Sequence, residues 1–263
     1  MILLNSLKRA SVTGALFCCL LITSAAHSVE ASCRPERLDE TAQVKHVHDG
    51  DTLWLTDGRK LRIIGINTPE LARDEKPAEP LAEQARDSLR RLLGKSPQIR
   101  IRYGKEKADR YDRLLAHVFL PDDTSISEYL LRQGLAYSLT VPPNVWLSDC
   151  YQRAELAARD RQQGLWSKQY YSVLNADRLS TDTRGFQIIR GRITRIGRSR
   201  KTVWLNFNRD FAVRIMKQDL DWFKGMDLEK LTGKSLEVRG WVQYHKGQLR
   251  MRIKHPSAIS ILP

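Results

Sequence analysis

The sequence predicts a closed β-barrel with flanking helices, an α+β fold, followed by a second small β-rich domain. Five strand-like segments fall between residues 42 and 120, with one helix-like segment inserted among them. Strands and helices do not alternate regularly, which argues against a parallel sheet. Beyond residue 185 the chain returns to short β-branched and aromatic segments separated by turns.

The spacing of apolar residues along the sequence distinguishes the expected strands of the first half from its expected helices. Turn signals at Asp49-Gly50-Asp51 and Asp57-Gly58 divide residues 42–65 into three alternating segments. Ser125 and Glu128 form a capping-box signal, which marks a helix start. We therefore expect strands within 42–65, at 98–103 and at 114–120, and helices at 79–93, from Ser125 to Gly134 and at 149–163. Five short strands with these helices suit a barrel of the oligonucleotide-binding type.

Residues 169–184 are rich in Ser, Thr, Asp and Asn and lack a regular apolar period, so they are expected to link two domains. The first domain then covers residues 40–168 and the second residues 185–263. Expected strands in the second domain are 186–196, 203–207, 211–215, 236–244, 249–253 and 258–261, with a helix near 220–231. This pattern fits an oligonucleotide-binding-like barrel, and an SH3-like barrel shares it.

The N-terminal segment has the features of a signal peptide. Lys8 and Arg9 precede an apolar run at residues 14–26, and small residues follow it. The run is shorter than the roughly 20 residues that span a bilayer as a helix. We expect residues 1–31 to direct export, with cleavage between Ala26 and Ala31 and a periplasmic or secreted product. An uncleaved membrane anchor is the alternative.

Cysteine usage agrees with export. Of the four cysteines, Cys18 and Cys19 lie inside the expected signal and would be removed with it. Cys33 and Cys150 remain, and a disulfide is the default expectation for one pair in an oxidising compartment. Lipidation of Cys33 at a new N-terminus is the alternative.

Positive charge is concentrated in the last third of the chain. The whole chain has a formal charge of +14, and residues 184–263 hold 18 Lys or Arg against 6 Asp or Glu. Such a domain favours polymers that carry phosphate, or anionic surfaces, through counterion release. A basic surface that serves only solubility is the other interpretation.

Residue types suited to phosphodiester hydrolysis occur in three segments of the first half. That reaction needs an activated water, a cation and further positive charge around the phosphate. Asp49-Gly50-Asp51-Thr52 offers oxygen ligands at a turn, and Asn67-Thr68-Pro69-Glu70 follows a strand that carries Arg62 between apolar residues. Asp109-Arg110-Tyr111-Asp112-Arg113 supplies a further arginine before the next strand.

These segments, with Arg132-Gln133-Gly134-Leu135-Ala136 and Gly164-Leu165-Trp166-Ser167, resemble the staphylococcal nuclease (thermonuclease) family in order and spacing over about residues 40–168. The resemblance implies a calcium-dependent nuclease acting on DNA, RNA or both; a binding module without activity is the alternative. It also implies site roles: catalysis by Arg62, Glu70 and Arg113, calcium binding by Asp51, Asn67 and the carbonyl of Thr68, and substrate contact by Tyr111 and Arg110.

Two positions depart from the family pattern. Asn67 stands where well-studied members carry an aspartate ligand, so weaker calcium binding is expected. The tyrosines that contact the nucleotide after the Gln-Gly-Leu-Ala segment are missing except for Tyr137, so less base stacking is expected in the active site.

The basic C-terminal domain combines arginines with aromatic residues. Arg250, Arg252 and Lys254 alternate along one expected strand and therefore share one sheet face. Two interpretations stay open, a groove for single-stranded nucleic acid and a scaffold in which the aromatic residues form core. The remaining residues behind this hypothesis are Arg190, Arg192, Arg195, Arg198, Arg200, Lys201, Trp204, Phe207, Trp241 and Tyr244.

Overall fold

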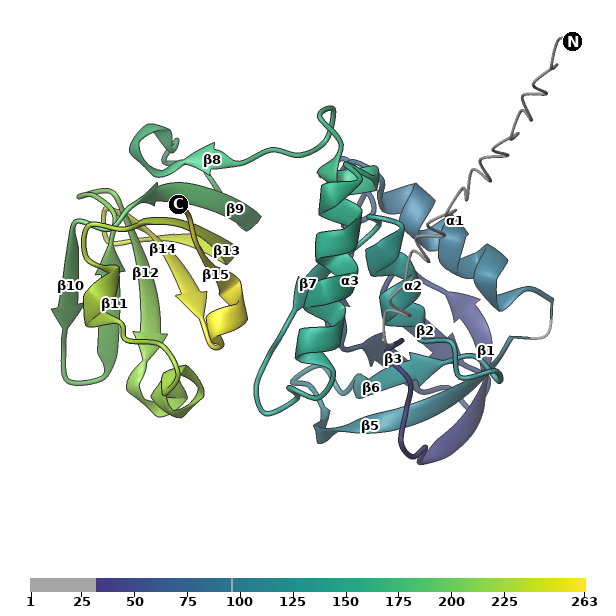
Figure 1. Ribbon diagram of the computed structural model, residues 1–263. Helices are drawn as coiled ribbons and strands as arrows, with labels where there is room; N and C mark the ends of the chain where they lie inside the picture. Colours follow the sequence, from purple (N-terminus) through teal and green to yellow (C-terminus); the bar gives the residue numbers. More distant parts are fainter. Residues whose placement is uncertain (1–31, 96) are drawn as a thin grey trace, which may run out of the picture. The chain divides into compact units, whose positions relative to one another are not determined.

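The computed structural model describes residues 32–95 and 97–263 (Figure 1). The expected signal peptide at residues 1–31, with Cys18 and Cys19, lies outside the described residues. Within the described ranges, no helix is both long enough and apolar enough to cross a membrane.

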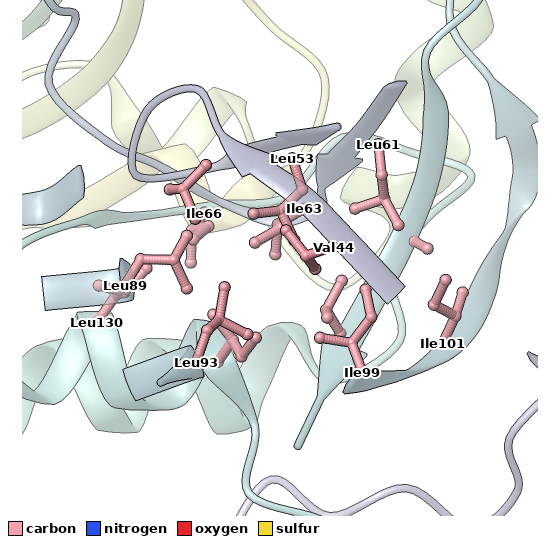
Figure 2. Packing of buried hydrophobic residues seen from close by; sticks show 14 of the residues in the cluster. Val44, Leu53, Leu61, Ile63, Ile66, Leu89, Leu93, Ile99, Ile101 and Leu130 are labelled. Atoms are coloured by element: carbon pink, nitrogen blue, oxygen red, sulfur yellow. The ribbon is translucent and has the colours of Figure 1, made fainter. Parts of the chain in front are cut away.

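Five strands of the first half close into a barrel in the order β1-β2-β3-β6-β5. The parallel pair is β3 with β6, and the other neighbours run antiparallel. Inward side chains such as Leu53, Ile63 and Ile99 fill the interior, as Figure 2 shows. The five strands are β1 (Glu40–Val47), β2 (Thr52–Leu55), β3 (Lys60–Ile63), β5 (Gln98–Ala108) and β6 (Leu114–Phe119).

Helices accompany this barrel at the places that the sequence predicts. Ser125 caps the second helix by accepting a hydrogen bond from the backbone N–H of Glu128, as the capping-box signal indicates. The first helix starts at Ala82 rather than residue 79, because Glu79 bonds to the backbone of Glu70 and Leu81 has a φ of 67°. The helical elements are α1 (Ala82–Leu93), α2 (Ile126–Arg132), α3 (Ser148–Asp160) and the 3-10 turn η1 (Gly164–Trp166).

Gly65 redirects the chain away from the barrel after β3. It has a φ of +89°, and a Cβ there would lie 2.3 Å from the ring of Tyr151. Glycine is therefore the residue that fits both the left-handed backbone and the close ring. The chain continues as β4 (Gly65–Asn67), which pairs with β7 (Tyr137–Leu139). This two-stranded sheet fixes the position of Asn67.

The second half forms an eight-stranded sheet with its own hydrophobic core. Its central order, β10-β11-β12-β14-β13-β9, repeats the strand order of the first barrel, with β12 and β14 as the parallel pair. The strands β9 and β10 are nearly continuous in the chain. Because β9 pairs with β13 and β10 pairs with β11, this first segment contacts the strands at both ends of the order β11-β12-β14-β13. The predicted fold class is therefore confirmed. The strands are β8 (Leu174–Asn175), β9 (Gly185–Arg192), β10 (Arg195–Arg198), β11 (Thr202–Asn206), β12 (Phe211–Met216), β13 (Ser235–His245), β14 (Gln248–Ile253) and β15 (Ile259–Ile261).

Two segments of the second half differ from the sequence-based expectation. The expected linker contains β8, which pairs with β9, and Ala176 packs in the core of the sheet. One small buried residue was too weak a signal against the polar composition around it. The expected helix near 220–231 consists of 3-10 turns, and the short helices here are η2 (Ala176–Arg178), η3 (Lys217–Phe223), η4 (Glu229–Leu231) and η5 (Pro256–Ala258).

Covalent and ionic contacts join segments that are far apart in the sequence. Cys33 and Cys150 form a disulfide, as predicted from their number and expected compartment. Glu155 of α3 accepts two hydrogen bonds of 2.7 Å from Nη1 of Arg239 on β13, and both residues are buried. A buried charge is costly without a partner, so breaking this pair is expected to destabilise the fold.

Candidate active site

Asp51 begins the site at the turn between β1 and β2. Only 5% of the residue is exposed, and its Oδ2 accepts a 2.9 Å hydrogen bond from the backbone N–H of Thr68. A Cβ on the preceding Gly50 would lie 2.7 Å from Cγ2 of Thr68, so the turn and the segment after β4 are in close contact. The glycine between the two aspartates is what allows this approach.

Arg62 points out of the barrel because it lies between the inward residues Leu61 and Ile63 on β3. Its Nη2 lies 3.0 Å from Oδ2 of Asp51 and donates to the carbonyl of Ile66 at 3.0 Å. The same nitrogen lies 3.5 Å from Oδ1 of Asn67. One guanidinium nitrogen is thus surrounded by three oxygen atoms.

The charge of Asp51 depends on its surroundings. Burial raises its pKa, Arg62 opposes that rise, and Asp49 adds to it. The Oδ2 atom of Asp51 is paired with the Arg62 guanidinium. The net effect is a raised pKa of Asp51, and the Arg62 guanidinium limits that rise.

Glu70 lies at the surface beside this cluster, with its carboxyl group partly shielded from water. Its backbone N–H donates to Oε2 of Glu79 at 3.0 Å, and its carbonyl accepts from the Glu79 N–H at 2.9 Å. Burial, Asp51 and Glu79 raise the pKa of Glu70, whereas Arg62 and Arg113 lower it. All of these charged groups are therefore close enough to act on one carboxylate.

Arg113 is held by Asp109 at the turn between β5 and β6. Oδ2 of Asp109 accepts from Nε at 2.8 Å and lies 2.7 Å from Nη2, while Oδ1 accepts from the Arg113 backbone N–H at 3.0 Å. Tyr111 is 63% exposed, and the Arg110 guanidinium lies 4.7 Å from its ring centre. Tyr111 and Arg110 thus form the outer edge of this turn.

Several known proteins are similar in sequence to the first half of this chain. The family described as staphylococcal nuclease homologue matches residues 60–168. A thermonuclease of Staphylococcus hyicus is 33% identical over 132 residues, which cover 49% of this chain and 77% of the relative. The chain belongs to the staphylococcal nuclease family. An endonuclease of Bacillus subtilis, YncB, is 31% identical, and the match covers 47% of this chain and 60% of the relative. An uncharacterized endonuclease of Escherichia coli is 28% identical, and the match covers 49% of this chain and 78% of the relative.

The oxygen atoms of Asp51, Asn67 and Thr68 suit the hard cation that the staphylococcal nuclease family implies. Asp51 supplies a carboxylate, Asn67 an amide oxygen and Thr68 a backbone carbonyl, which lies 3.5 Å from Nδ2 of Asn67. Calcium prefers oxygen ligands of these kinds. Asp51 provides the single carboxylate of this ligand set. Among the described residues there is no group of three or more His, Cys, Asp or Glu arranged for a metal. The donor set fits a cation bound with modest affinity.

Sequence reasoning missed two residues that position the site. Asp109 was noted only as the start of a motif, yet it holds Arg113 through both of its oxygen atoms. Glu79 was assigned to a helix, yet it closes the loop that carries Glu70. The four-residue spacing from Asp109 to Arg113 across one turn is a signal that could have indicated the first contact. Nothing local indicated the second, because its partner is nine residues away across a loop.

Proposed function

We propose that this protein is an exported, calcium-dependent endonuclease that hydrolyses phosphodiester bonds of DNA, RNA or both. Membership of the staphylococcal nuclease family makes it a nuclease, a hydrolase that acts on nucleic acid. The finer proposal depends mainly on one observation: Asp51, Arg62 and the backbone of residues 66–68 meet in a cluster whose charges act on Glu70.

Glu70 is the proposed general base. A base works best when its pKa approaches the working pH, and burial together with Asp51 and Glu79 raises the pKa of this carboxyl group. The loop closed by Glu79 holds the Glu70 backbone in place. Glu70 would accept the proton of the attacking water.

Arg62 and Arg113 are the proposed phosphate-binding residues. Planar guanidinium groups can give two parallel hydrogen bonds to phosphate oxygens, which suits the charge that develops in the transition state. Arg113 is kept in place by Asp109, and Arg62 by Asp51 and the carbonyl of Ile66. Tyr111 and Arg110 would contact the polymer next to the cleaved bond.

Asp51, Asn67 and the carbonyl of Thr68 are the proposed calcium ligands. When bound, the ion would supply positive charge to the non-bridging oxygens of the phosphate. The carboxylate of Asp51 would be shared between the ion and Arg62, since its Oδ2 already contacts that arginine. Asn67 would contribute its amide oxygen.

The remaining parts of the proposal concern export and the second half of the chain. Residues 1–31 would direct the protein to the periplasm or the exterior, in agreement with the Cys33–Cys150 disulfide. Residues 40–168 would form the nuclease domain. Residues 185–263, which carry most of the net positive charge, would hold the polymer.

Digestion of a labelled single-stranded DNA tests the catalytic proposal. We expect cleavage with calcium, none with a chelator, and a loss of at least about a hundredfold in Glu70→Gln, the scale for removing a general base. Glu83→Gln is the matched control, because Glu83 is exposed in the first turn of α1. Calcium-independent cleavage, or equal rates in the two variants, would refute the proposal. Binding without cleavage by the unmodified protein would instead favour an inactive binding module.

A further inference from the structure

One outward face of the second sheet carries a row of arginines beside a tryptophan. The register places Trp204 of β11 opposite Arg214 of β12, and Arg214 opposite Arg252 of β14. Arg250 lies two residues before Arg252 on β14, so it shares the same face. We call Trp204, Arg214, Arg250 and Arg252 the arginine face. Phe207, by contrast, is buried in the core.

The arginine face holds more positive charge than its surroundings neutralise. Burial, together with the nearby charges of Arg252 and Arg250, lowers the pKa of Arg214. Nε of Arg214 and Nε of Arg252 are buried without a hydrogen-bond partner among the described residues. Asp219 lies 2.8 Å from Arg252 and offsets part of the charge. Crowded, partly desolvated cations of this kind are stabilised by a bound anion.

A hollow of about 320 Å³ opens beside this face. Trp204 forms one wall, and the Arg250 guanidinium lies 5.1 Å from the centre of its ring. Asn206 and Gln248 also line the hollow, with their amide nitrogens donating to the backbone carbonyls of Arg195 and Arg209. None of the described residues that line the hollow carries a carboxylate. Arg198 also lines it, although it is paired with Glu229. A flat aromatic wall beside arginines suits a nucleobase attached to phosphates.

Strand β3 of the barrel and strand β12 of the second sheet each carry an arginine between two buried residues. Arg62 lies between buried Leu61 and Ile63 on β3, and Arg214 lies between buried Val213 and Ile215 on β12. Arg62 contacts the carboxylate of Asp51, whereas the strand neighbours of Arg214 are an aromatic ring and another arginine. The second position therefore has the charge to bind phosphate, and neither of its strand neighbours is acidic.

We propose that the arginine face binds a single-stranded segment of the polynucleotide, with one base in the hollow against Trp204 and the flanking phosphates on Arg214, Arg250 and Arg252. This inference rests on the proposed nuclease function and adds to it a place where uncut polymer is held. Neighbouring strands lie about 4.8 Å apart, so the face extends roughly 10 Å from Trp204 to Arg252. That length accommodates more than one nucleotide, which favours a polymer over free phosphate.

Binding of a fluorescent single-stranded oligodeoxynucleotide tests the inference in the full-length chain carrying Glu70→Gln, so that the probe stays intact. We expect Arg214→Gln to weaken binding at least about tenfold and to reduce the slope of log K against log salt by roughly 0.7, the share of one phosphate contact. Trp204→Leu should weaken binding about tenfold with the slope unchanged, because stacking does not release counterions. Trp204→Phe should retain binding within about twofold.

Lys224→Gln is the matched control, because Lys224 is exposed, paired with Asp221 and absent from the lining of the hollow. The affinity of this variant for the oligonucleotide should stay within about twofold of that of the parent. Thermal unfolding of each variant checks that loss of binding is not loss of fold. Parent-like binding by Arg214→Gln, or by Trp204→Leu, would overturn the inference. So would full displacement of the probe by inorganic phosphate at the probe's own concentration, which would indicate a simple anion site.

The inference and the proposed function fail in different ways. If the unmodified protein does not cleave this oligonucleotide with calcium, but the two face variants lose binding, the catalytic proposal fails and the arginine face stands. If cleavage occurs and the face variants bind normally, the catalytic proposal stands and the arginine face does not.

Discussion

His117 is expected to make the barrel sensitive to acid at pH values where most carboxylates do not titrate. It lies on β6, is only 2% exposed, and its Nδ1 is 3.0 Å from the hydroxyl of Tyr151. Burial and the nearby Arg102 lower its pKa to about 3. The folded protein therefore keeps this imidazole neutral, whereas the unfolded chain protonates it near pH 6.5.

The sign and size of the effect follow from these two pKa values. Between pH 6.5 and about 3 the unfolded state binds one more proton than the folded state at His117, so stability falls as the pH falls. Each pH unit in this window costs about 1.4 kcal/mol. Going from pH 7 to pH 5 should therefore remove about 2 kcal/mol of the free energy of unfolding.

Urea denaturation followed by circular dichroism at pH 7 and pH 5, at constant salt, measures this loss. We expect the loss to be about 2 kcal/mol smaller in His117→Gln, whatever the stability of that variant at pH 7. The raised pKa values of Asp51 and Glu70 act in the opposite direction, so the difference between the two proteins is the quantity to compare. An equal loss in both proteins would show that His117 is not held neutral.

Two further predictions concern the cation site and the disulfide. Asn67→Asp should tighten calcium binding about tenfold in a calorimetric titration, because a second carboxylate joins the ligand set. The same variant should unfold more easily in chelator, since the new charge lies near buried Asp51; unchanged affinity would argue against Asn67 as a ligand. Replacing both Cys33 and Cys150 by serine should cost on the order of 4–5 kcal/mol in urea denaturation, because the disulfide spans 117 residues. A loss below about 1 kcal/mol would contradict this estimate from chain entropy.

The sequence by itself determined the barrel and most element boundaries, and it led to the proposed site residues. Alternation around Arg62 placed the arginine on the outer side of a strand, and the turn residues placed Asp51 and Glu70 in loops. These features are local, because side-chain direction in a strand and glycine in a turn depend on neighbouring residues. The five ordered motifs then indicated the family.

Only the tertiary structure decided which groups meet. The contacts of Arg62 with Asp51 and Ile66, and of Glu70 with Glu79, depend on how a barrel closes and how a loop returns. The tertiary structure also separated Phe207, which fills a core, from Trp204, which faces outward beside three arginines. Both residues are aromatic and lie three positions apart in the sequence, so residue type does not tell them apart. Their strand register and burial do, and these result from pairing between distant segments.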